Sequence, residues 1–239
     1  MLPRDYHSSV VPFDRIVRLH LAHFIAPPPH PRAGRRIVVG AYVVPHPDGL
    51  LLFDTGLGLA DEETERMVPA VRHSLPDVLA EGGFRLEDVR LVVNCHLHYD
   101  HSGWNKLFPG VPIFVQRREY EEARTVDYTI PDVYEFPGAR FELLDGEAEP
   151  LRGIVIVPTP GHTAGHQSLV VETERGRVIL AGQAYNEASE FSLARFQRRL
   201  RLSGQDPEAE AGPDWLDRVE EAEPVRVVFA HDEAVWEPQ

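Results

Sequence analysis

The sequence predicts a single domain of the α/β class in which strands outnumber helices. The 239-residue chain is 43% hydrophobic, so it can bury one substantial core. Short apolar runs of strand length recur along it, and stretches with helical periodicity lie between them. No repeat of fixed period and no low-complexity tract divides the chain. We therefore expect one domain over residues 1–239.

The first predicted elements are a hairpin and a helical region. Apolar runs at residues 37–44 and 50–54 predict two strands, joined by a longer loop at residues 45–49. Apolar residues then recur at three- and four-residue steps over residues 61–79, which predicts an amphipathic helical region divided by Pro69 and Pro76. The apolar residues of this region are Met67, Val68, Val71, Leu75, Val78 and Leu79.

The rest of the chain alternates short apolar runs with a few helical stretches. Strands are expected at residues 91–94, 113–116, 154–157, 168–172, 178–181 and 225–230. Helices are expected at residues 118–124 and 213–221. The histidine-containing motifs follow predicted strands, at the loop edge where functional sites are commonly built.

Composition excludes several classes of partner and compartment. The chain has 24 Lys and Arg against 38 Asp and Glu, and this net charge of −14 repels a phosphate backbone, so we expect no nucleic acid partner. The single cysteine, Cys95, rules out an internal disulfide and fits the reducing cytoplasm. No signal-peptide apolar segment is visible, and no run approaches the ~18 apolar residues that a membrane span needs. We expect a cytoplasmic protein that does not contact a membrane.

A dense cluster of potential metal ligands follows the strand predicted at residues 91–94. His96, His98, Asp100 and His101 lie within six residues. In an extended segment, residues 96, 98 and 100 point to one side, so these three side chains can converge, and His101 must reach them through a turn. Imidazole and carboxylate ligands without thiolate favour Zn²⁺, with Mn²⁺, Fe²⁺ and Co²⁺ as alternatives. The spacing disfavours a surface loop of merely solvated polar residues.

Two later segments offer further ligands. His162 lies in the block Thr159-Pro160-Gly161-His162-Thr163-Ala164-Gly165-His166, whose glycines allow a sharp turn after a predicted strand. His231, with Asp232 beside it, directly follows the last predicted strand. Each segment would be modest support alone, and both fit a site assembled at strand ends.

These motifs together resemble the metallo-β-lactamase superfamily. The resemblance is carried by residues 96–101 (His-Leu-His-Tyr-Asp-His), residues 160–163 (Pro-Gly-His-Thr), His231 and an early Phe-Asp-Thr-Gly at residues 53–56. It implies a four-layer αββα sandwich with the site between loops at one edge of two facing sheets. It further implies that His96, His98 and His162 hold one metal ion and that Asp100, His101 and His231 hold a second. Asp54 and His166 would then support the ligands.

One position departs from the pattern of the superfamily. Members with two metal ions carry a bridging aspartate in an Ala-Gly-Asp element, whereas this chain has Ala181-Gly182-Gln183. The carbonyl oxygen of Gln183 can bind a metal ion but brings no negative charge, so a second ion should be held more weakly. The sequence leaves open whether Gln183 is a metal ligand. It also leaves open whether the site binds one metal ion or two.

The motif from His98 to Asn105 and the compact length resemble the N-acyl homoserine lactone lactonase group. This resemblance implies a quorum-quenching enzyme that opens a lactone by attack of metal-bound hydroxide, with Asp100 orienting the hydroxide or passing its proton to the leaving alkoxide. Tyr185 is the candidate for a tyrosine near the carbonyl, although a packing role fits it equally. The alternatives are a hydrolase of other esters or thioesters, and a metal-binding protein without turnover because of Gln183. Homodimers are common among such relatives.

The stretch after Gln183 offers candidate substrate contacts. Two interpretations apply to each group of side chains. Apolar residues at near-helical spacing can line an acyl channel or belong to the core: Phe191, Phe196, Leu200 and Leu202. Arginines nearby can bind a substrate carboxylate or form a solvated face: Arg195, Arg198, Arg199 and Arg201.

Overall fold

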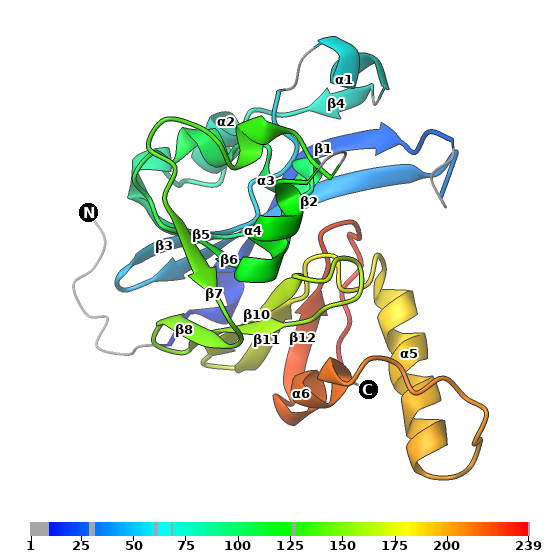
Figure 1. Cartoon of the computed structure of the whole chain (residues 1–239). Coiled ribbons are helices and arrows are strands. Elements are labelled where there is room, and N and C mark those ends of the chain that lie inside the picture. Colours follow the sequence, from blue (N-terminus) through cyan, green and yellow to red (C-terminus); the bar gives the residue numbers. More distant parts are fainter. Residues whose placement is uncertain (1–9, 29–31, 60–61, 68, 126–127, 239) are drawn as a thin grey trace.

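The computed structural model describes residues 10–28, 32–59, 62–67, 69–125 and 128–238. In this part of the chain, strands β1 to β12 form two sheets (Figure 1). The first sheet has the strand order β4-β1-β2-β3-β5-β6-β7, with β1 (Val17–Ile25), β2 (Arg36–His46), β3 (Gly49–Phe53), β4 (Ala70–Arg72), β5 (Val89–Val93), β6 (Ile113–Gln116) and β7 (Phe141–Leu144). The second has the order β12-β11-β10-β9-β8, with β8 (Ala148–Leu151), β9 (Ile154–Pro158), β10 (Gln167–Thr173), β11 (Gly176–Leu180) and β12 (Pro224–Val228).

Helices cover the outer faces of both sheets. The helices of the described residues are α1 (Glu62–Met67), α2 (Leu75–Glu81), α3 (Tyr99–Ser102), α4 (Arg117–Ala123), α5 (Ala188–Leu202) and α6 (Trp215–Glu221), with short 3₁₀ turns η1 (Phe13–Arg15), η2 (Leu86–Asp88), η3 (Asn105–Leu107) and η4 (Pro131–Val133). α2 and α4 contribute buried residues to the outer face of the first sheet, and α5 and α6 contribute them to the outer face of the second. Figure 1 shows α2 above the first sheet and α5 and α6 below the second.

Alternation along the strands explains why the sheets stack. Leu51 and Phe53 of β3 point into the core between the two sheets, whereas Leu52 points to the helix-covered face. Val178 and Leu180 of β11 point into the same inner core, and Ile179 points toward α5 and α6. Successive side chains of a strand point to opposite faces, so strands that are apolar at every position must be covered on both sides. The expected αββα sandwich is confirmed.

The predicted strands all form, and the helices expected at residues 118–124 and 213–221 are α4 and α6. The hairpin of β2 and β3 also forms, but the prediction of a longer loop at residues 45–49 was wrong. His46 pairs with Gly49, so only Pro47 and Asp48 connect the strands. Gly49 has a φ of +129°, which lets the chain enter β3 directly after the turn. His46 Nδ1 accepts a hydrogen bond from the Asp48 backbone N–H at 3.1 Å, which holds the turn closed.

The helical region expected over residues 61–79 was wrong in its middle part. α1 ends before Pro69, and Ala70–Arg72 form strand β4, which pairs antiparallel with the edge of β1. Val71 is therefore 53% exposed, whereas Leu75 and Leu79 of α2 are fully buried. Residues 61 and 68 and the side chain of Met67 lie outside the described residues. Hydrogen bonds available at the edge of β1 outweighed helical periodicity in this segment.

Strands β1, β7 and β8 and the 15-residue helix α5 were missing from the prediction. The apolar side chains of α5 divide between two environments. Phe191 is 2% exposed and belongs to the core under the second sheet, whereas Phe196 and Leu202 are 46% and 71% exposed. A core role is therefore correct for Phe191 alone. Among the described residues, no helix has the length and apolar character needed to span a bilayer.

Candidate metal centre

The predicted ligands meet because the strands that precede them end at a shared edge. Strands β3 and β5 run parallel, and Asp54 and His96 follow their carboxyl ends. Strands β11 and β12 also run parallel and are followed by Gln183 and His231, and β9, which has the same direction as β11, leads to His162. Carboxyl ends of strands with one direction lie at the same edge, which explains how residues 54 to 231 form one site.

His96, His98 and His162 form one group of facing ligand atoms. One nitrogen from each ring lies within 4.8 Å of the others. His98 Nδ1 and His162 Nε2 are 3.1 Å apart, and the ring centroids of the three residues are 4.6 to 5.0 Å apart. His96 is fully buried at the base of the group, and His162 is exposed at its rim. We call this group the first subsite.

Asp100, His101 and His231 form a second group beside the first. His101 Nε2 lies 3.1 Å from His231 Nε2, and Asp100 Oδ2 lies 3.7 and 3.5 Å from these two atoms. The rings of His96 and His101 are 4.1 Å apart, so this second subsite adjoins the first. The expectation that Asp100 points with His96 and His98 in an extended segment was wrong. The chain turns into α3 at Tyr99, and this helical turn carries Asp100 to His101 instead.

The donor set fits divalent metal ions. Nitrogen ligands of a tetrahedral zinc ion lie about 3.3 Å apart, close to the 3.1 Å between His98 and His162 and between His101 and His231. His96 Nε2 is buried and has no hydrogen-bond partner within the described part of the chain. An unpaired polar atom in the interior is unfavourable, and an ion bound at this nitrogen would satisfy it.

The electrostatics of His96, His162 and His231 favour neutral imidazoles, the form that binds metal. Burial lowers the pKa of His96 well below its usual value, with further lowering by His101 and His98. Burial and the neighbouring His98 lower the pKa of His162 to about 3. The same effects, burial first and then His101, lower the pKa of His231 to about 4. These rings therefore offer lone pairs at neutral pH.

Asp100 and His101 have the opposite electrostatics. Burial alone raises the pKa of Asp100, but His101 and His231 lower it to about 2. Burial alone lowers the pKa of His101, but the carboxylates of Asp100 and Asp54 raise it to about 9. Asp100 is thus an ionised carboxylate at neutral pH. A metal ion that binds His101 Nε2 must displace a proton from this ring.

Asp54 and the backbone of β2 orient the rings of the second subsite. Asp54 has a φ of 63°, a left-handed conformation that Asp and Asn tolerate better than most residues. Its Oδ1 accepts a hydrogen bond from the Cys95 backbone N–H at 2.7 Å, and its Oδ2 lies 3.0 Å from His101 Nδ1. His231 Nδ1 donates to the Val38 carbonyl at 2.7 Å. Because each Nδ1 is used in this way, each Nε2 faces the metal site.

Gln183 points its carbonyl toward the second subsite. Its Oε1 lies 3.1 Å from His101 Nε2, and its side-chain NH₂ donates to Asn186 Oδ1 at 3.1 Å. The Gln183 backbone N–H donates to His166 Nε2 at 3.1 Å, and His166 Nδ1 donates in turn to the Thr159 carbonyl. Gly182, at a φ of +56°, packs so closely that a Cβ atom would lie 2.4 Å from Cys95 Cβ. Through its hydrogen bond with the Gln183 backbone N–H, His166 positions the backbone of Gln183.

Cys95 lies close to the ligands without joining them. Its Sγ is within reach of His96 Nδ1 and His101 Nδ1, at 3.1 and 3.3 Å. Burial and the nearby Asp54 carboxylate raise the pKa of the thiol well above its usual value, so the metal-free thiol is protonated at neutral pH. The thiol instead donates a hydrogen bond to Asp54 Oδ2 at 3.0 Å.

Tyr185 packs beside helices in the structure. Its ring centroid lies 5.9 Å from that of Phe191 and 5.7 Å from that of Trp215, and the partly buried side chain packs against the core under the second sheet. Its catalytic role stays a prediction. Among the described tyrosines, Tyr128 packs against a candidate ligand, with its ring centroid 4.8 Å from that of His98.

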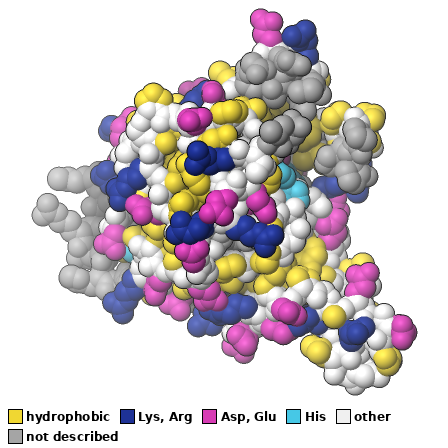
Figure 2. Space-filling model, in the orientation of Figure 1, with side chains coloured by type: hydrophobic (Ala, Val, Ile, Leu, Met, Phe, Trp, Pro, Cys, Tyr) yellow, Lys and Arg dark blue, Asp and Glu magenta, His cyan; other side chains and the backbone are white. Residues whose placement is uncertain are grey.

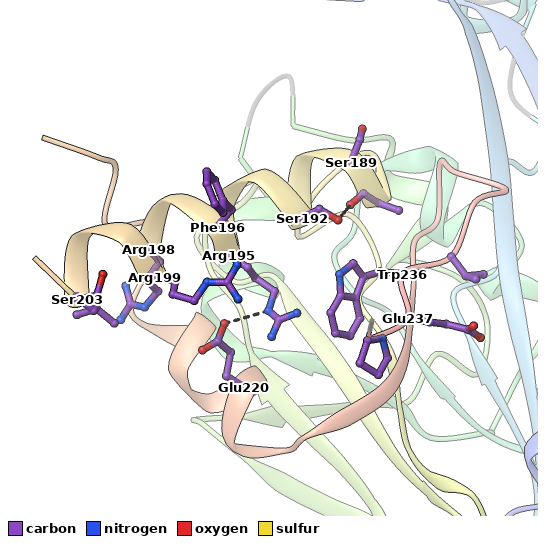
Figure 3. A pocket seen from close by; sticks show the side chains of 14 residues that line it. Ser189, Ser192, Arg195, Phe196, Arg198, Arg199, Ser203, Glu220, Trp236 and Glu237 are labelled. Atoms are coloured by element: carbon purple, nitrogen blue, oxygen red, sulfur yellow. Dashed lines mark hydrogen bonds and ion pairs between the residues drawn. The ribbon is translucent and has the colours of Figure 1, made fainter. Parts of the chain in front are cut away.

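The arginines of α5 are largely engaged within the protein. Arg198 is buried and pairs with Asp217, Arg195 pairs with Glu220, and Arg201 donates to backbone carbonyls of the following loop. Arg195, Arg198 and Arg199 line a cavity of about 910 Å³ between α5 and the C-terminal segment, where Arg195 points toward Glu220 (Figure 3). None of the predicted metal ligands lines this cavity. Pairing within the protein disfavours Arg195 and Arg198 as a binding site for a substrate carboxylate. The alternative prediction, a solvated face, was wrong for Arg198, which is buried.

Charge on the visible face of the molecule is mixed. Figure 2 shows acidic and basic side chains interspersed over this face. The net charge of −14 is therefore not gathered there into one acidic patch.

Sequence reasoning missed Glu119, a fully buried carboxylate next to the first subsite. It accepts hydrogen bonds from the Leu97 backbone N–H and from Thr163 Oγ1, both at 2.7 Å, and from the Tyr128 hydroxyl. The stretch that contains it, Arg-Arg-Glu-Tyr-Glu-Glu-Ala at residues 117–123, reads as a solvated helix, and no pattern in it marks one glutamate as buried.

A site built from histidines and an aspartate at the strand ends of an αββα sandwich defines a class of metal-dependent hydrolases. The family model of the metallo-β-lactamase superfamily matches residues 34–231. The chain belongs to this superfamily.

Curated relatives and solved structures agree with this assignment. An N-acyl homoserine lactonase from a Bacillus species is 30% identical over 208 residues, 81% of each chain, and the N-acyl homoserine lactonase AttM of Rhizobium johnstonii is 27% identical over 85% of each chain. The structure of Bacillus thuringiensis AiiA with bound N-decanoyl-L-homoserine superposes with a TM-score of 0.68 over 94% of each chain, at 22% identity. At this identity the superposition supports the fold alone.

Proposed function

We propose that this hydrolase opens the ring of a lactone, with an N-acyl homoserine lactone as the first candidate substrate. One observation carries the proposal. The first and second subsites adjoin each other at the strand ends, and each offers three donor atoms that fit a divalent ion. The similarity to N-acyl homoserine lactonases over 81% of each chain supports the substrate class. Quorum quenching would be the biological consequence of this activity.

We propose Zn²⁺ as the resident ion, because the donors of both subsites are imidazole and carboxylate groups. Bound there, such an ion polarises an ester carbonyl and makes water a better nucleophile at neutral pH. His96, His98 and His162 would hold the first ion, and Asp100, His101 and His231 the second. Mn²⁺, Fe²⁺ and Co²⁺ are compatible with the same donors.

Asp100 is the group that we expect to move the proton. Its carboxylate is ionised at neutral pH, so it can accept the proton that the attacking water loses. As the water oxygen bonds to the carbonyl carbon and the ring C–O bond breaks, Asp100 can pass this proton to the released alkoxide. The product is a hydroxy acid, with all atoms of the lactone and one water retained.

Gln183 is proposed as a neutral ligand of the second ion. The hydrogen bond from its NH₂ group to Asn186 supports this role, because it turns the carbonyl oxygen toward His101. A neutral oxygen attracts a cation less strongly than a carboxylate, so the second ion should bind more weakly than the first.

Tyr185 is retained as the candidate for a hydroxyl near the substrate carbonyl. The variant Tyr185→Phe keeps the ring that packs against Phe191 and Trp215 and removes only the hydroxyl. A lower kcat at unchanged stability would support the catalytic role, and an unchanged kcat would assign Tyr185 to packing.

We further propose a cytoplasmic location, since Cys95 is the single cysteine of the chain and is free and buried. A small lactone or ester is the proposed partner, and a homodimer is the assembly suggested by relatives of this kind.

The second candidate function is metal binding without hydrolytic turnover, which Gln183 favours because it removes the charge of the bridging aspartate. Hydrolysis of other esters or thioesters would use the same site. The deciding experiment is elemental analysis of the purified chain together with a panel of lactones, esters and thioesters. We expect one to two equivalents of metal and chelator-sensitive ring opening that His98→Ala abolishes. Bound metal without turnover on any substrate would favour the second candidate.

A further inference from the structure

Glu119 is a buried carboxylate outside the predicted ligand set. It lies in the first turn of α4 and is 0% exposed. Among the described residues, no lysine or arginine forms an ion pair with it. A buried carboxylate without a cationic partner is costly unless hydrogen bonds satisfy it. The contacts of Glu119 therefore need a specific explanation.

Three donors converge on this carboxylate. Oε1 accepts the Leu97 backbone N–H at 2.7 Å and the Tyr128 hydroxyl, and Oε2 accepts the Thr163 hydroxyl at 2.7 Å. Three donors on two oxygens use most of the acceptor capacity of the side chain, which offsets the cost of burying it.

The donors belong to the segments that carry the first subsite. Leu97 lies between His96 and His98, and Thr163 directly follows His162. Tyr128 places its ring 4.8 Å from the ring of His98. One side chain thus connects the segments of all three histidines, although the segments lie far apart in sequence.

Close packing of the His162 segment against α4 makes these contacts possible. A Cβ atom on Gly165 would lie 2.3 Å from the Glu119 backbone nitrogen and 2.5 Å from its Cα. Such distances exclude any side chain at residue 165. The glycine therefore lets the segment approach α4 closely enough for Thr163 to reach the carboxylate.

We propose that Glu119 is a positioning residue of the metal centre, which holds the His96–His98 segment and the His162 segment at the separation that the first ion requires. It acts through Leu97, Thr163 and Tyr128 and does not bind the ion itself. This inference rests on the metal-binding part of the proposed function and not on the identity of the substrate.

The test is zinc binding to the metal-free chain, measured by competition with a chromophoric chelator. The variant Glu119→Gln keeps the size of the side chain and removes its charge and one acceptor. Loss of a group that orients metal ligands typically weakens metal affinity about 10–100-fold, and we expect a change of this size for the first equivalent of zinc. The variant Glu121→Gln changes an exposed glutamate of the same helix and should bind zinc as the native chain does.

A spectroscopic measurement separates positioning from a general loss of stability. Cobalt loaded in place of zinc reports its coordination geometry in its visible absorption. We expect Glu119→Gln to alter this spectrum, and the variant Thr163→Val, which removes one donor, to weaken zinc binding by a smaller factor. If Glu119→Gln does not fold, Thr163→Val and Tyr128→Phe decide the question by the same two measurements.

Failure of the positioning role and failure of the proposed function give different results. A folded Glu119→Gln variant with native zinc affinity and an unchanged cobalt spectrum refutes the positioning role alone, as do native values in both replacement variants if Glu119→Gln does not fold. A native chain that binds no zinc refutes the proposed function itself.

Discussion

Replacing Asp54 by Asn should weaken metal binding at the second subsite and leave the fold in place. Asn tolerates the φ of 63° at this residue about as well as Asp does. The Asn carbonyl can still accept the Cys95 backbone N–H, but its NH₂ group then replaces Oδ2, which lies 3.0 Å from His101 Nδ1. Two donors would face each other, so His101 loses the orientation that points Nε2 toward the ion.

The size of the effect follows from the contact that is lost. A hydrogen bond to a charged group contributes about 1.5–3 kcal/mol. Removing the partner of a metal-binding histidine weakens metal affinity about 10–100-fold, equivalent to about 1.4–2.7 kcal/mol. The two ranges overlap, so we expect the second equivalent of zinc to bind about 10–100-fold more weakly. The first equivalent, whose ligands do not contact Asp54, should keep its affinity.

The assay is stepwise zinc titration of the metal-free chain against a chelator, with circular dichroism to confirm folding. Asp77→Asn, which changes an exposed carboxylate of α2, is the matched control. Native affinity for both equivalents in Asp54→Asn would show that this carboxylate does not orient His101. A loss confined to the first equivalent would show that the two subsites have been assigned in the wrong order.

Three further predictions follow from the site and the core. Gln183→Asp should tighten the second equivalent of zinc in the same titration, because it places a negative charge at the residue whose neutral carbonyl now faces His101 Nε2; an unchanged affinity would place Gln183 outside the ligand set. Phe191→Ala should lower the free energy of unfolding by about 3–5 kcal/mol in denaturant titration, since the ring is 2% exposed, and leave zinc affinity unchanged. Zinc at 100 times its Kd should raise the free energy of unfolding by about 2.7 kcal/mol, and a chelator should reverse this gain; a metal-independent stability would contradict the assigned site.

The cluster of candidate ligands could be predicted from the sequence because metal chemistry restricts residue type and spacing. His96, His98, Asp100 and His101 stand out within six residues, and the strand ends then place His162 and His231 with them. The grouping of Asp100 with His101 could not be derived from alternation, since a single helical turn decides it.

Elements whose form depends on distant partners could not be predicted. Strand β1 contains an irregularity between His20 and Ala22, which breaks the two-residue alternation that identifies strands. Strand β4 has three residues, too few for a periodic signal, and forms because the edge of β1 offers hydrogen bonds. Glu119 is likewise buried by a loop more than 40 residues away, which its own helix does not reveal.

The division of the two sheets along the chain has a consequence for how the molecule comes apart. Residues 17–144 supply every strand of the first sheet, and residues 148–228 supply every strand of the second. Each subsite takes two side chains from the first part, the pairs His96 with His98 and Asp100 with His101, and one from the second, His162 or His231. Ions bound there would cross-link the two halves of the polypeptide, so separation of the sheets would have to wait for ion release. The lifetime of the folded state would then be set by the rate at which the metal ions dissociate. Two fragments of the chain, divided between β7 and β8, would reassemble more readily when metal is present.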